Sequence, residues 1–197
     1  MTQTVDGRTA RSARTRAAVV TAVLELVRAG NPRPTAKEIA TRAGISLRSV
    51  YVHFDDLDDL FAEAGARQAD EVAHLLYPID AGLPRPERIN EVVRQRAAIW
   101  EALAPVRRAI LVWASSSATL RERGQRVTDR SIRDLARVFA VELAGYDSEC
   151  ATLVLEALNV ASSAGAWEVL RSERGLSVEN AAAVVAATLT ALLDDPQ

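Results

Sequence analysis

Apolar residues recur every three or four positions along most of the chain, which is the spacing of helices that bury one face. No stretch shows the strict alternation of apolar and polar residues that is typical of a half-buried β-strand. The first helical pattern covers about residues 12–29 and stops at Gly30-Asn31-Pro32, so we expect a first helix to end there. The sequence therefore predicts an all-α fold of about nine helices.

Two short helices are predicted next, on either side of Gly44. Thr35 and Glu38 have the spacing of a capping box, in which each side chain accepts a hydrogen bond from the backbone amide of the other residue. Gly44 can close the first helix because glycine readily adopts the left-handed backbone conformation, and Ser46 can cap the second. Two short helices joined by a glycine turn are typical of a helix-turn-helix.

Each short helix has an apolar face that can pack inward, and the second also has a face left free. The inward-facing residues are expected to be Ile39, Ala40, Ala43, Ile45, Val50 and Phe54. The free face, which could enter a DNA major groove, carries Leu47, Arg48, Ser49, Val52 and His53. Arg48 is our candidate for reading sequence, because its planar guanidinium can donate two hydrogen bonds to guanine.

The rest of the chain is predicted to form longer helices. Pro105 is expected to begin a new helix, because proline is favoured at a first helical position. The expected ranges are about 55–76, 87–103, 105–114, 118–143, 148–171 and 177–193. We expect two domains: a helix-turn-helix DNA-binding domain over residues 1–54 and a helical ligand-binding and dimerisation domain over residues 55–197.

Charge divides the chain in the same way. Residues 1–54 carry nine basic and three acidic side chains, whereas residues 55–197 carry 15 basic and 23 acidic ones. A basic module joined to an acidic remainder suggests that the first part faces a polyanion such as double-stranded DNA.

Chemistry other than binding has little support in the sequence. Cys150 is the only cysteine, which excludes an intrachain disulfide and a cysteine-based zinc site. The two histidines, His53 and His74, show no metal-ligand spacing, and there is no phosphate-binding glycine loop or nucleophile elbow. We therefore expect no cofactor, no metal and no enzymatic activity. With no apolar signal segment at the start, we expect a cytoplasmic protein.

The final predicted helix is apolar almost all round, especially over residues 181–193. This run is too short to span a bilayer, so another surface must cover it. We expect the last two helices to pair with those of a second copy in a four-helix bundle, with Val185 and Ala186 at the interface of a homodimer. The alternative is that both helices are simply central core.

The amino-terminal fifty-odd residues resemble the TetR family of one-component transcriptional regulators. The resemblance lies in Thr35-Ala-Lys-Glu-Ile-Ala, in Ala43-Gly-Ile-Ser46, in Ser49-Val-Tyr-Val-His-Phe54 and in the acidic start of the next helix. It implies a ligand-responsive regulator that binds a palindromic operator as a homodimer. The expected sign is repression, relieved when a small-molecule effector binds.

The resemblance also implies roles for particular residues. Thr35, Tyr51 and His53 are expected to contact phosphates, and Lys37 a phosphate or a base edge. The residues expected to enter the major groove are Leu47, Arg48 and Ser49. The family usually has a lysine where this chain has Leu57, within the run Asp55-Asp-Leu-Asp-Asp59. That run should repel phosphates, so a protein with this fold that has lost DNA binding stays an alternative.

A regulator also needs a site for its effector, and the resemblance implies a cavity among the helices between residues 55 and 170. Three tryptophans stand out in a chain with only 5% aromatic residues. With nearby polar residues they could form an apolar pocket with a few polar contacts, although each tryptophan could equally fill the core. The candidate ligand-binding residues are Arg96, Trp100, Trp113, Asn159, Ser163 and Trp167.

Overall fold

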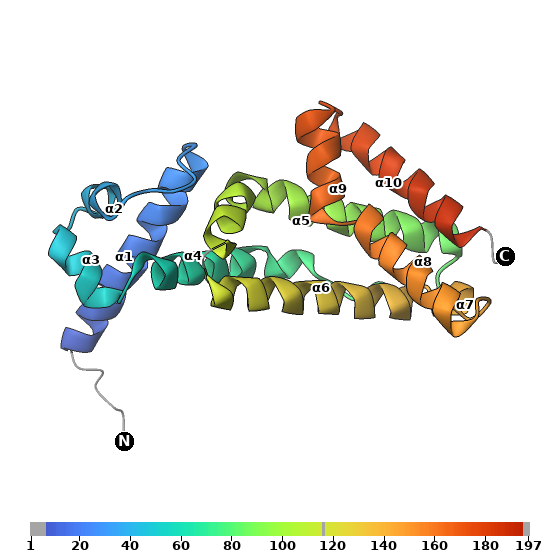
Figure 1. Cartoon of the computed structure of the whole chain (residues 1–197), viewed down its shortest axis with the longest axis horizontal. Helices are drawn as coiled ribbons and strands as arrows, with labels where there is room; N and C mark the ends of the chain where they lie inside the picture. Colours follow the sequence, from blue (N-terminus) through green and yellow to red (C-terminus); the bar gives the residue numbers. More distant parts are fainter. Residues whose placement is uncertain (1–6, 116, 195–197) are drawn as a thin grey trace, which may run out of the picture. The chain divides into compact units, whose positions relative to one another are not determined.

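A computed structural model describes residues 7–115 and 117–194, and within these ranges every regular element is a helix (Figure 1). The predicted all-α class is confirmed. The chain divides into two compact units: unit 1 comprises Met1–Glu71 and Pro105–Arg123, and unit 2 comprises Val72–Ala104 and Gly124–Gln197. The predicted boundary at residue 54 separates two functional domains, whereas these units are defined by compactness. The predicted boundary therefore stays a prediction.

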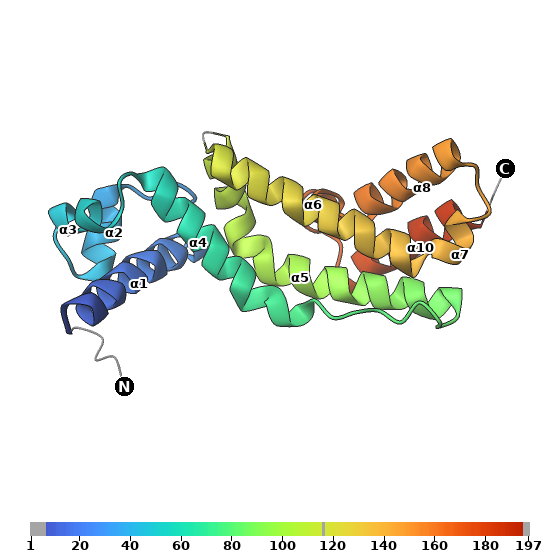
Figure 2. The same ribbon diagram turned by 90° about the horizontal axis from the view of Figure 1, so that it is seen from below.

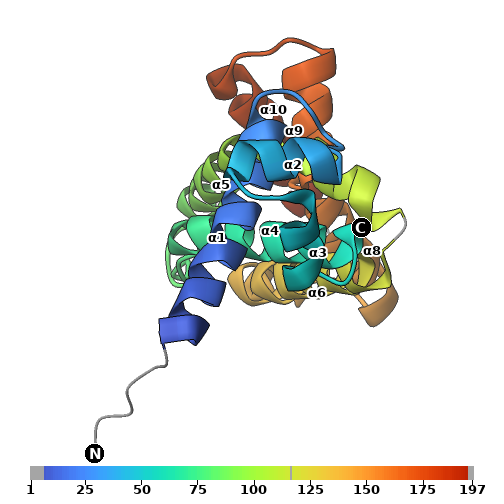
Figure 3. The same ribbon diagram turned by 90° about the vertical axis from the view of Figure 1, so that its left-hand side faces the viewer.

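Unit 1 is built on the amino-terminal helices. They are α1 (Gly7–Arg28), α2 (Ala36–Ala43), α3 (Leu47–His53) and α4, which runs from Leu57 to Val72. Figure 3 faces this unit and shows α2 and α3 beside α1, on which both pack. The first helix begins earlier than the apolar spacing predicted, because residues 7–11 lie before its first buried position and give no periodic signal.

The core of unit 1 joins these helices through apolar side chains. Val20, Val23 and Leu24 of α1 are at most 1% exposed, as are Ile39 of α2 and Val50 of α3. A second part of this core is aromatic: Phe61 of α4 stacks on Trp113, with ring centroids 4.2 Å apart and planes 6° from parallel. The position of α3 is therefore fixed by burial of one face against α1 and α2.

The helix predicted to begin at Pro105 does not begin there. Instead α5 runs without interruption from Arg85 to Ala114, with Pro105 inside it. A proline inside a helix loses one backbone hydrogen bond and costs about 3 kcal/mol. Val106 and Ala109, one and four residues after it, are at most 1% exposed, so core packing offsets that cost.

Unit 2 contains α5 up to Ala104 and most of the later helices, while Pro105–Ala114 of α5 belongs to unit 1 (Figure 2). A short 3₁₀ turn, η1 (Ala73–Leu75), follows α4, and a loop leads to α5. The later elements are α6 (Ala118–Val138), α7 (Ala140–Leu143), α8 (Ser148–Ala161), α9 (Ala164–Glu168), the π-helical η2 (Val169–Glu173) and α10 (Val178–Leu193). The first six residues of α6 belong to unit 1, and α8 packs on α10 within unit 2.

The predicted helix over residues 148–171 is interrupted in the structure. Ser162 is 4% exposed, and its hydroxyl donates back to the Leu158 carbonyl at 2.8 Å. Ser163 then caps α9 by accepting from the Ala166 amide at 3.2 Å. The predicted helix over 118–143 is also divided, at the fully buried Phe139. Both breaks lie where the apolar spacing continues, so the spacing alone did not reveal them.

Two polar contacts lie around α7 in unit 2. Arg88 of α5 forms a buried double hydrogen bond with Glu142, at 2.8 and 2.6 Å, and also donates to the Val138 carbonyl at 2.6 Å. These bonds from Arg88 hold the pKa of Glu142 below its usual value. At the start of α8, Asp147 accepts from the Cys150 amide at 2.9 Å, and its carboxylate raises the pKa of the Cys150 thiol.

By length and composition alone, one described helical stretch, Ser148–Glu173, is long and apolar enough to cross a bilayer. Apolar helices of many non-membrane proteins meet the same criterion. The stretch is the one broken at Ser162, and only 17% of its most apolar window is buried within the chain. Its outer face is therefore both apolar and uncovered.

Candidate DNA-binding site

The start of α2 is fixed by the predicted capping box. The Thr35 amide donates to the Glu38 carboxylate at 2.7 Å, and the Glu38 amide donates to the Thr35 hydroxyl oxygen at 3.3 Å. The hydroxyl itself donates to the same carboxylate at 2.7 Å. These bonds from Thr35 lower the pKa of Glu38. Any bond from the Thr35 hydroxyl to a phosphate must therefore replace the bond to Glu38.

The turn between α2 and α3 also has the predicted form. Gly44 adopts φ 68° and ψ 32°, a left-handed conformation that strains any residue with a side chain. The Ile45 amide donates to the Ala40 carbonyl at 3.0 Å, which closes α2. Ser46 caps α3 by accepting from the Ser49 amide at 3.1 Å.

The two faces of α3 differ sharply in exposure. Val50 is 1% exposed and Phe54, just after the helix, is 3% exposed. On the opposite face Leu47 is 45% exposed and Tyr51 52% exposed, and Arg48 is exposed beside them. The helix therefore presents a surface of apolar, aromatic and cationic side chains.

The other predicted contact residues lie around this surface. Thr35 and Lys37 are exposed at the first turn of α2, whereas Ser49 and His53 are half-buried on α3. The Ser49 hydroxyl is hydrogen-bonded to that of Ser46 at 2.8 Å. The structure therefore brings all seven predicted residues to the helix-turn-helix, while their contacts with DNA stay predictions.

Arg16 of α1 supports α3, a role that was not predicted from the sequence. Its guanidinium donates to the His53 carbonyl, which is one of the carbonyls that a helix leaves open at its end. It also donates to Glu63 at 2.7 Å and lies 4.1 Å from the centre of the Phe54 ring. One arginine thus links α1, the end of α3 and α4. In the sequence it resembles the other amino-terminal arginines.

A second arginine, on α2, ties that helix to α1. Arg42 donates to the Glu25 carboxylate of α1 at 2.6 Å. Exposed ion pairs of this kind contribute little individually, typically less than about 1 kcal/mol. Their value here is geometric, because Arg16 and Arg42 fix both short helices against one support.

The acidic run after α3 has a structural use. Asp56 accepts a hydrogen bond from the Asp59 amide at 2.8 Å and so caps the start of α4. Acidic side chains at this end also interact favourably with the helix dipole. Asp55, Asp56 and Asp59 are exposed, while Leu57 is half-buried. The run therefore stabilises α4, and its effect on DNA affinity is a separate question.

The six predicted ligand-binding residues do not form one group. In unit 2, Arg96 donates to the Ser131 hydroxyl at 2.8 Å, and Ser131 donates to the Asn159 side-chain oxygen at 2.9 Å. Trp113 belongs to unit 1, where it stacks on Phe61.

The other three candidates have local structural roles in unit 2. The Trp100 indole donates to the Ser162 carbonyl at 3.0 Å, and the Trp167 indole donates to Glu101 at 2.8 Å. Ser163 is the cap of α9. Arg96 and Asn159 are therefore the two candidates that the structure joins in one hydrogen-bonded chain, through Ser131.

The apolar hairpin of unit 2 has both a buried and an open face. Leu153 and Val160 of α8 are 65% and 63% exposed, and Val184 of α10 is 43% exposed. Val185, which we expected at an interface, is only 4% exposed and lies in the core of its own unit. The helical turn rotates Val185 inward and Val184 outward, which the all-apolar sequence of α10 could not distinguish.

No protein-family model and no curated protein matches this sequence. Solved structures do match. A transcriptional regulator from Rhodococcus sp. Rha1 superposes with a TM-score of 0.67 at 20% identity, over 91% of this chain and 96% of that chain. A candidate TetR-family transcriptional regulator from Mesorhizobium loti MAFF303099 gives 0.62 at 18% identity, over 93% and 97%. This chain has the TetR-type fold.

A third match has the same fold and a known small-molecule complex. It is the multidrug binding protein EbrR complexed with imidazole, with a TM-score of 0.62 at 18% identity, over 88% of this chain and 93% of that one. At these identities the likeness shows the fold alone. The TetR-type fold extends over about nine tenths of the chain, and the motif resemblance in residues 35–54 agrees with it.

Proposed function

We propose that this protein is a transcriptional regulator that binds a palindromic DNA operator as a homodimer. It acts as a repressor, and a small-molecule effector releases it. The exposed face of α3 is the observation that carries the proposal. Solvated helices rarely expose several large apolar residues together, and Leu47, Tyr51 and Val52 are 45%, 52% and 70% exposed.

The chemistry of this face suits a DNA major groove. Arg48 can donate two hydrogen bonds to guanine, and Leu47 can pack against a thymine methyl group. Lys37 and the Tyr51 hydroxyl lie exposed nearby and can hold phosphates, which sets register rather than sequence. A single α3 reads only a short stretch, so a pair of reading helices is needed for a palindromic site.

The open face of the α8–α10 hairpin supports the homodimer. Leu153, Val160 and Val184 are large apolar side chains exposed on helices that pack together. Covering them with the same face of a second copy creates a symmetric four-helix bundle. The dimer then carries two α3 helices, which must match half-sites about 34 to 36 Å apart.

Release by an effector would act through the distance between the two α3 helices of the dimer. A ligand that binds better to a conformer with a different α3 separation shifts the population toward it, and operator affinity falls by that differential binding energy. EbrR, of the same fold, is a multidrug binding protein solved with imidazole, which supports a small organic effector here.

The test is recovery of DNA by the purified full-length protein. Duplex fragments carrying a random central segment are passed over the protein, recovered and sequenced, with binding then measured by gel shift. We expect enrichment of one inverted repeat. Arg48→Ala should weaken binding to that repeat by about 10-fold to 100-fold and relax selection at one base pair. Tyr51→Phe, the matched control, should weaken all sequences alike.

The acidic run after α3 favours a second candidate: a ligand-binding or interaction protein of this fold that does not bind DNA. Asp55, Asp56 and Asp59 are exposed directly after the reading helix. This candidate predicts no enriched repeat and no retention of any duplex at low salt. Selection of a repeat that is lost in Arg48→Ala would eliminate it.

A further inference from the structure

Unit 2 contains a cavity of about 220 Å³ between the segment after α4 and the helices α5 and α6. Its walls combine polar and apolar residues, and the apolar ones include Leu76, Ile79, Val92 and Leu135. Pockets for drug-sized ligands typically exceed about 300 Å³, so this cavity suits a smaller molecule. Three arginines and one aspartate also line it: Arg96, Arg130, Arg137 and Asp134.

Arg96 differs from the other buried arginine of α5. Arg88 and Arg96 lie two helical turns apart, at 5% and 8% exposure. Arg88 is fully paired, since it shares two hydrogen bonds with Glu142 and has carbonyl partners as well. Arg96 has one protein acceptor among the described residues, the neutral Ser131 hydroxyl at 2.8 Å. A buried guanidinium has five donors and normally requires an anionic partner.

Burial acts on Arg96 without compensation by an ion pair. Desolvation lowers the pKa of Arg96, and the charge of Asp134 opposes this only in part. Asp134 instead lies 3.9 Å from Arg130, at the exposed edge of the cavity. Among the described residues, no carboxylate therefore forms an ion pair with the buried Arg96 guanidinium.

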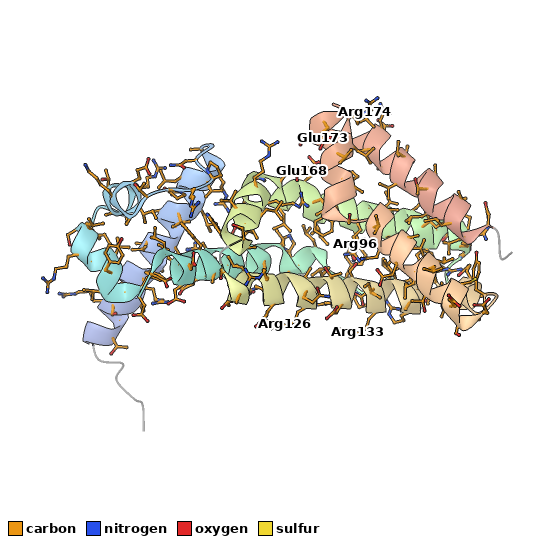
Figure 4. The ribbon with its side chains drawn as sticks, viewed as in Figure 1. Arg96, Arg126, Arg133, Glu168, Glu173 and Arg174 are labelled. Atoms are coloured by element: carbon orange, nitrogen blue, oxygen red, sulfur yellow. The ribbon has the colours of Figure 1, made fainter. Side chains whose placement is uncertain are left out.

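The surrounding contacts hold this cation in place. Ser131 donates onward to the Asn159 side chain at 2.9 Å, so α5, α6 and α8 are joined at Arg96. Arg137 donates to the Ile79 carbonyl at 2.9 Å and Gln95 to the Tyr77 carbonyl at 2.7 Å, which fixes the wall of the cavity. Figure 4 shows Arg96 among the helices of unit 2, whereas Arg133 lies on the outer side of α6.

We propose that this cavity binds a small organic carboxylate, with the buried Arg96 guanidinium donating to its two oxygens and the apolar walls enclosing its hydrocarbon part. The proposal names the chemical class of the effector and rests on the function proposed above. A planar guanidinium matches a carboxylate with two parallel hydrogen bonds. The apolar walls select a carboxylate with a hydrocarbon body over inorganic phosphate.

The same contacts give the ligand a route to the dimer surface within unit 2. Arg96 is bonded to Ser131, and Ser131 is bonded to Asn159 of α8. Asn159 directly precedes Val160, one of the exposed residues of the open hairpin face. Through this chain of hydrogen bonds, a carboxylate bound to Arg96 is linked to the helix that is proposed to contact the second subunit.

The test uses calorimetric titration of the full-length protein with benzoate. Benzamide, which has the same shape without the charge, and sodium phosphate are the comparison probes. We expect benzoate to bind between about 10-fold and 100-fold more tightly than benzamide, because hydrogen bonds to charged groups are the stronger ones. Equal binding of benzoate and benzamide, or tighter binding of phosphate, would overturn the proposal.

Variants then place the site. Arg96→Met removes the charged guanidinium and keeps an unbranched apolar stem, and it should weaken benzoate binding at least about 10-fold. Arg96→Lys keeps the charge but loses the planar fork, and its affinity for benzoate should lie between those of the parent and Arg96→Met. Arg133→Met, the control on the exposed side of α6, should bind as the parent does. Parent-like benzoate binding by both Arg96 variants would show that water satisfies Arg96 and that the site lies elsewhere.

Gel shifts with the selected DNA separate this proposal from the function on which it rests. Benzoate binding that depends on Arg96 but leaves DNA retention unchanged would support the site and contradict release by effector. Operator binding without any carboxylate binding by the parent would overturn the site and leave the regulator intact.

Discussion

The face of α3 and the open face of the α8–α10 hairpin both expose large apolar side chains, yet they suit different partners. On α3, Leu47 and Tyr51 lie beside Arg48, and Lys37 is exposed on the neighbouring helix. On the hairpin, Leu153 and Val160 share their helix face with Thr152 and Glu156. Around Val184 the exposed neighbours on α10 are asparagine, alanine and threonine.

The difference shows that exposure alone does not identify a partner. Donors and positive charge beside apolar groups favour a surface that offers both phosphates and base edges. The hairpin face carries the acidic Glu156 and no basic side chain beside its apolar groups, which favours packing against a similar helix rather than against phosphates. The following substitutions test whether the α3 face binds DNA and whether the hairpin face binds a second copy.

The largest effect is expected at the hairpin. Val184→Arg places a charge where a second copy is proposed to pack, and burying an unpaired charge costs several kcal/mol. We expect the dimer dissociation constant to rise by at least about 100-fold, with loss of operator binding at the same protein concentration. Sedimentation velocity measures the first effect and gel shift the second.

Val141→Arg is the matched control for this change. Val141 is 75% exposed on α7, outside both hairpin helices, so the same substitution there should leave the dimer intact. If Val184→Arg sediments as the parent does, the two copies meet elsewhere. A substitution at Val185, which the sequence predicted at the interface, would not test the dimer, because that side chain supports the core of its own unit.

An intermediate effect is expected when α3 loses its support. Arg16→Met removes the bonds to the His53 carbonyl and Glu63 without touching the reading surface. We expect α3 to become more mobile and affinity for all duplexes to fall by about 10-fold. Hydrogen exchange at the α3 amides should rise in the same variant.

Arg14→Met tests whether lost charge explains that result. Arg14 is exposed on α1, so its loss removes one positive charge and no support of α3. It should leave exchange at α3 unchanged. A similar rise in exchange in both variants would contradict the role of Arg16.

The smallest effect concerns the acidic run. Leu57→Lys adds a positive charge beside the acidic run and should strengthen binding to any duplex a few-fold at low salt. The slope of log affinity against log salt should steepen by about one unit. Leu57→Gln removes the leucine without adding charge and should not steepen it. An unchanged slope in the lysine variant would place the run away from the DNA.

The helix-turn-helix was predictable because its chemistry is local. Thr35, Glu38, Gly44 and Ser46 each act within four residues of their own position, so their spacing specified the caps and the turn. The inward face followed from the period of Val50 and its neighbours. The all-α class was predictable for the same reason.

The missed features depend on contacts between distant segments. Pro105 lies inside α5 because the residues after it pack into a core that the sequence does not display. The adjacent Ser162 and Ser163 could have indicated a helix end followed by a new helix cap. The apolar spacing continues across them, so the sequence was interpreted as one helix. The link from Arg96 through Ser131 to Asn159 joins three helices, and no short motif encodes it.

Cys150 makes the wild-type chain suitable for spectroscopy without engineering. It is the single thiol, at the first turn of α8, and the neighbouring Asp147 disfavours its ionised form. A reagent added at alkaline pH therefore attaches one nitroxide per subunit, while storage near neutrality leaves the thiol slow to oxidise. Electron-spin distance measurements on two such labels would follow how far the hairpins of a pair move when effector or DNA is added.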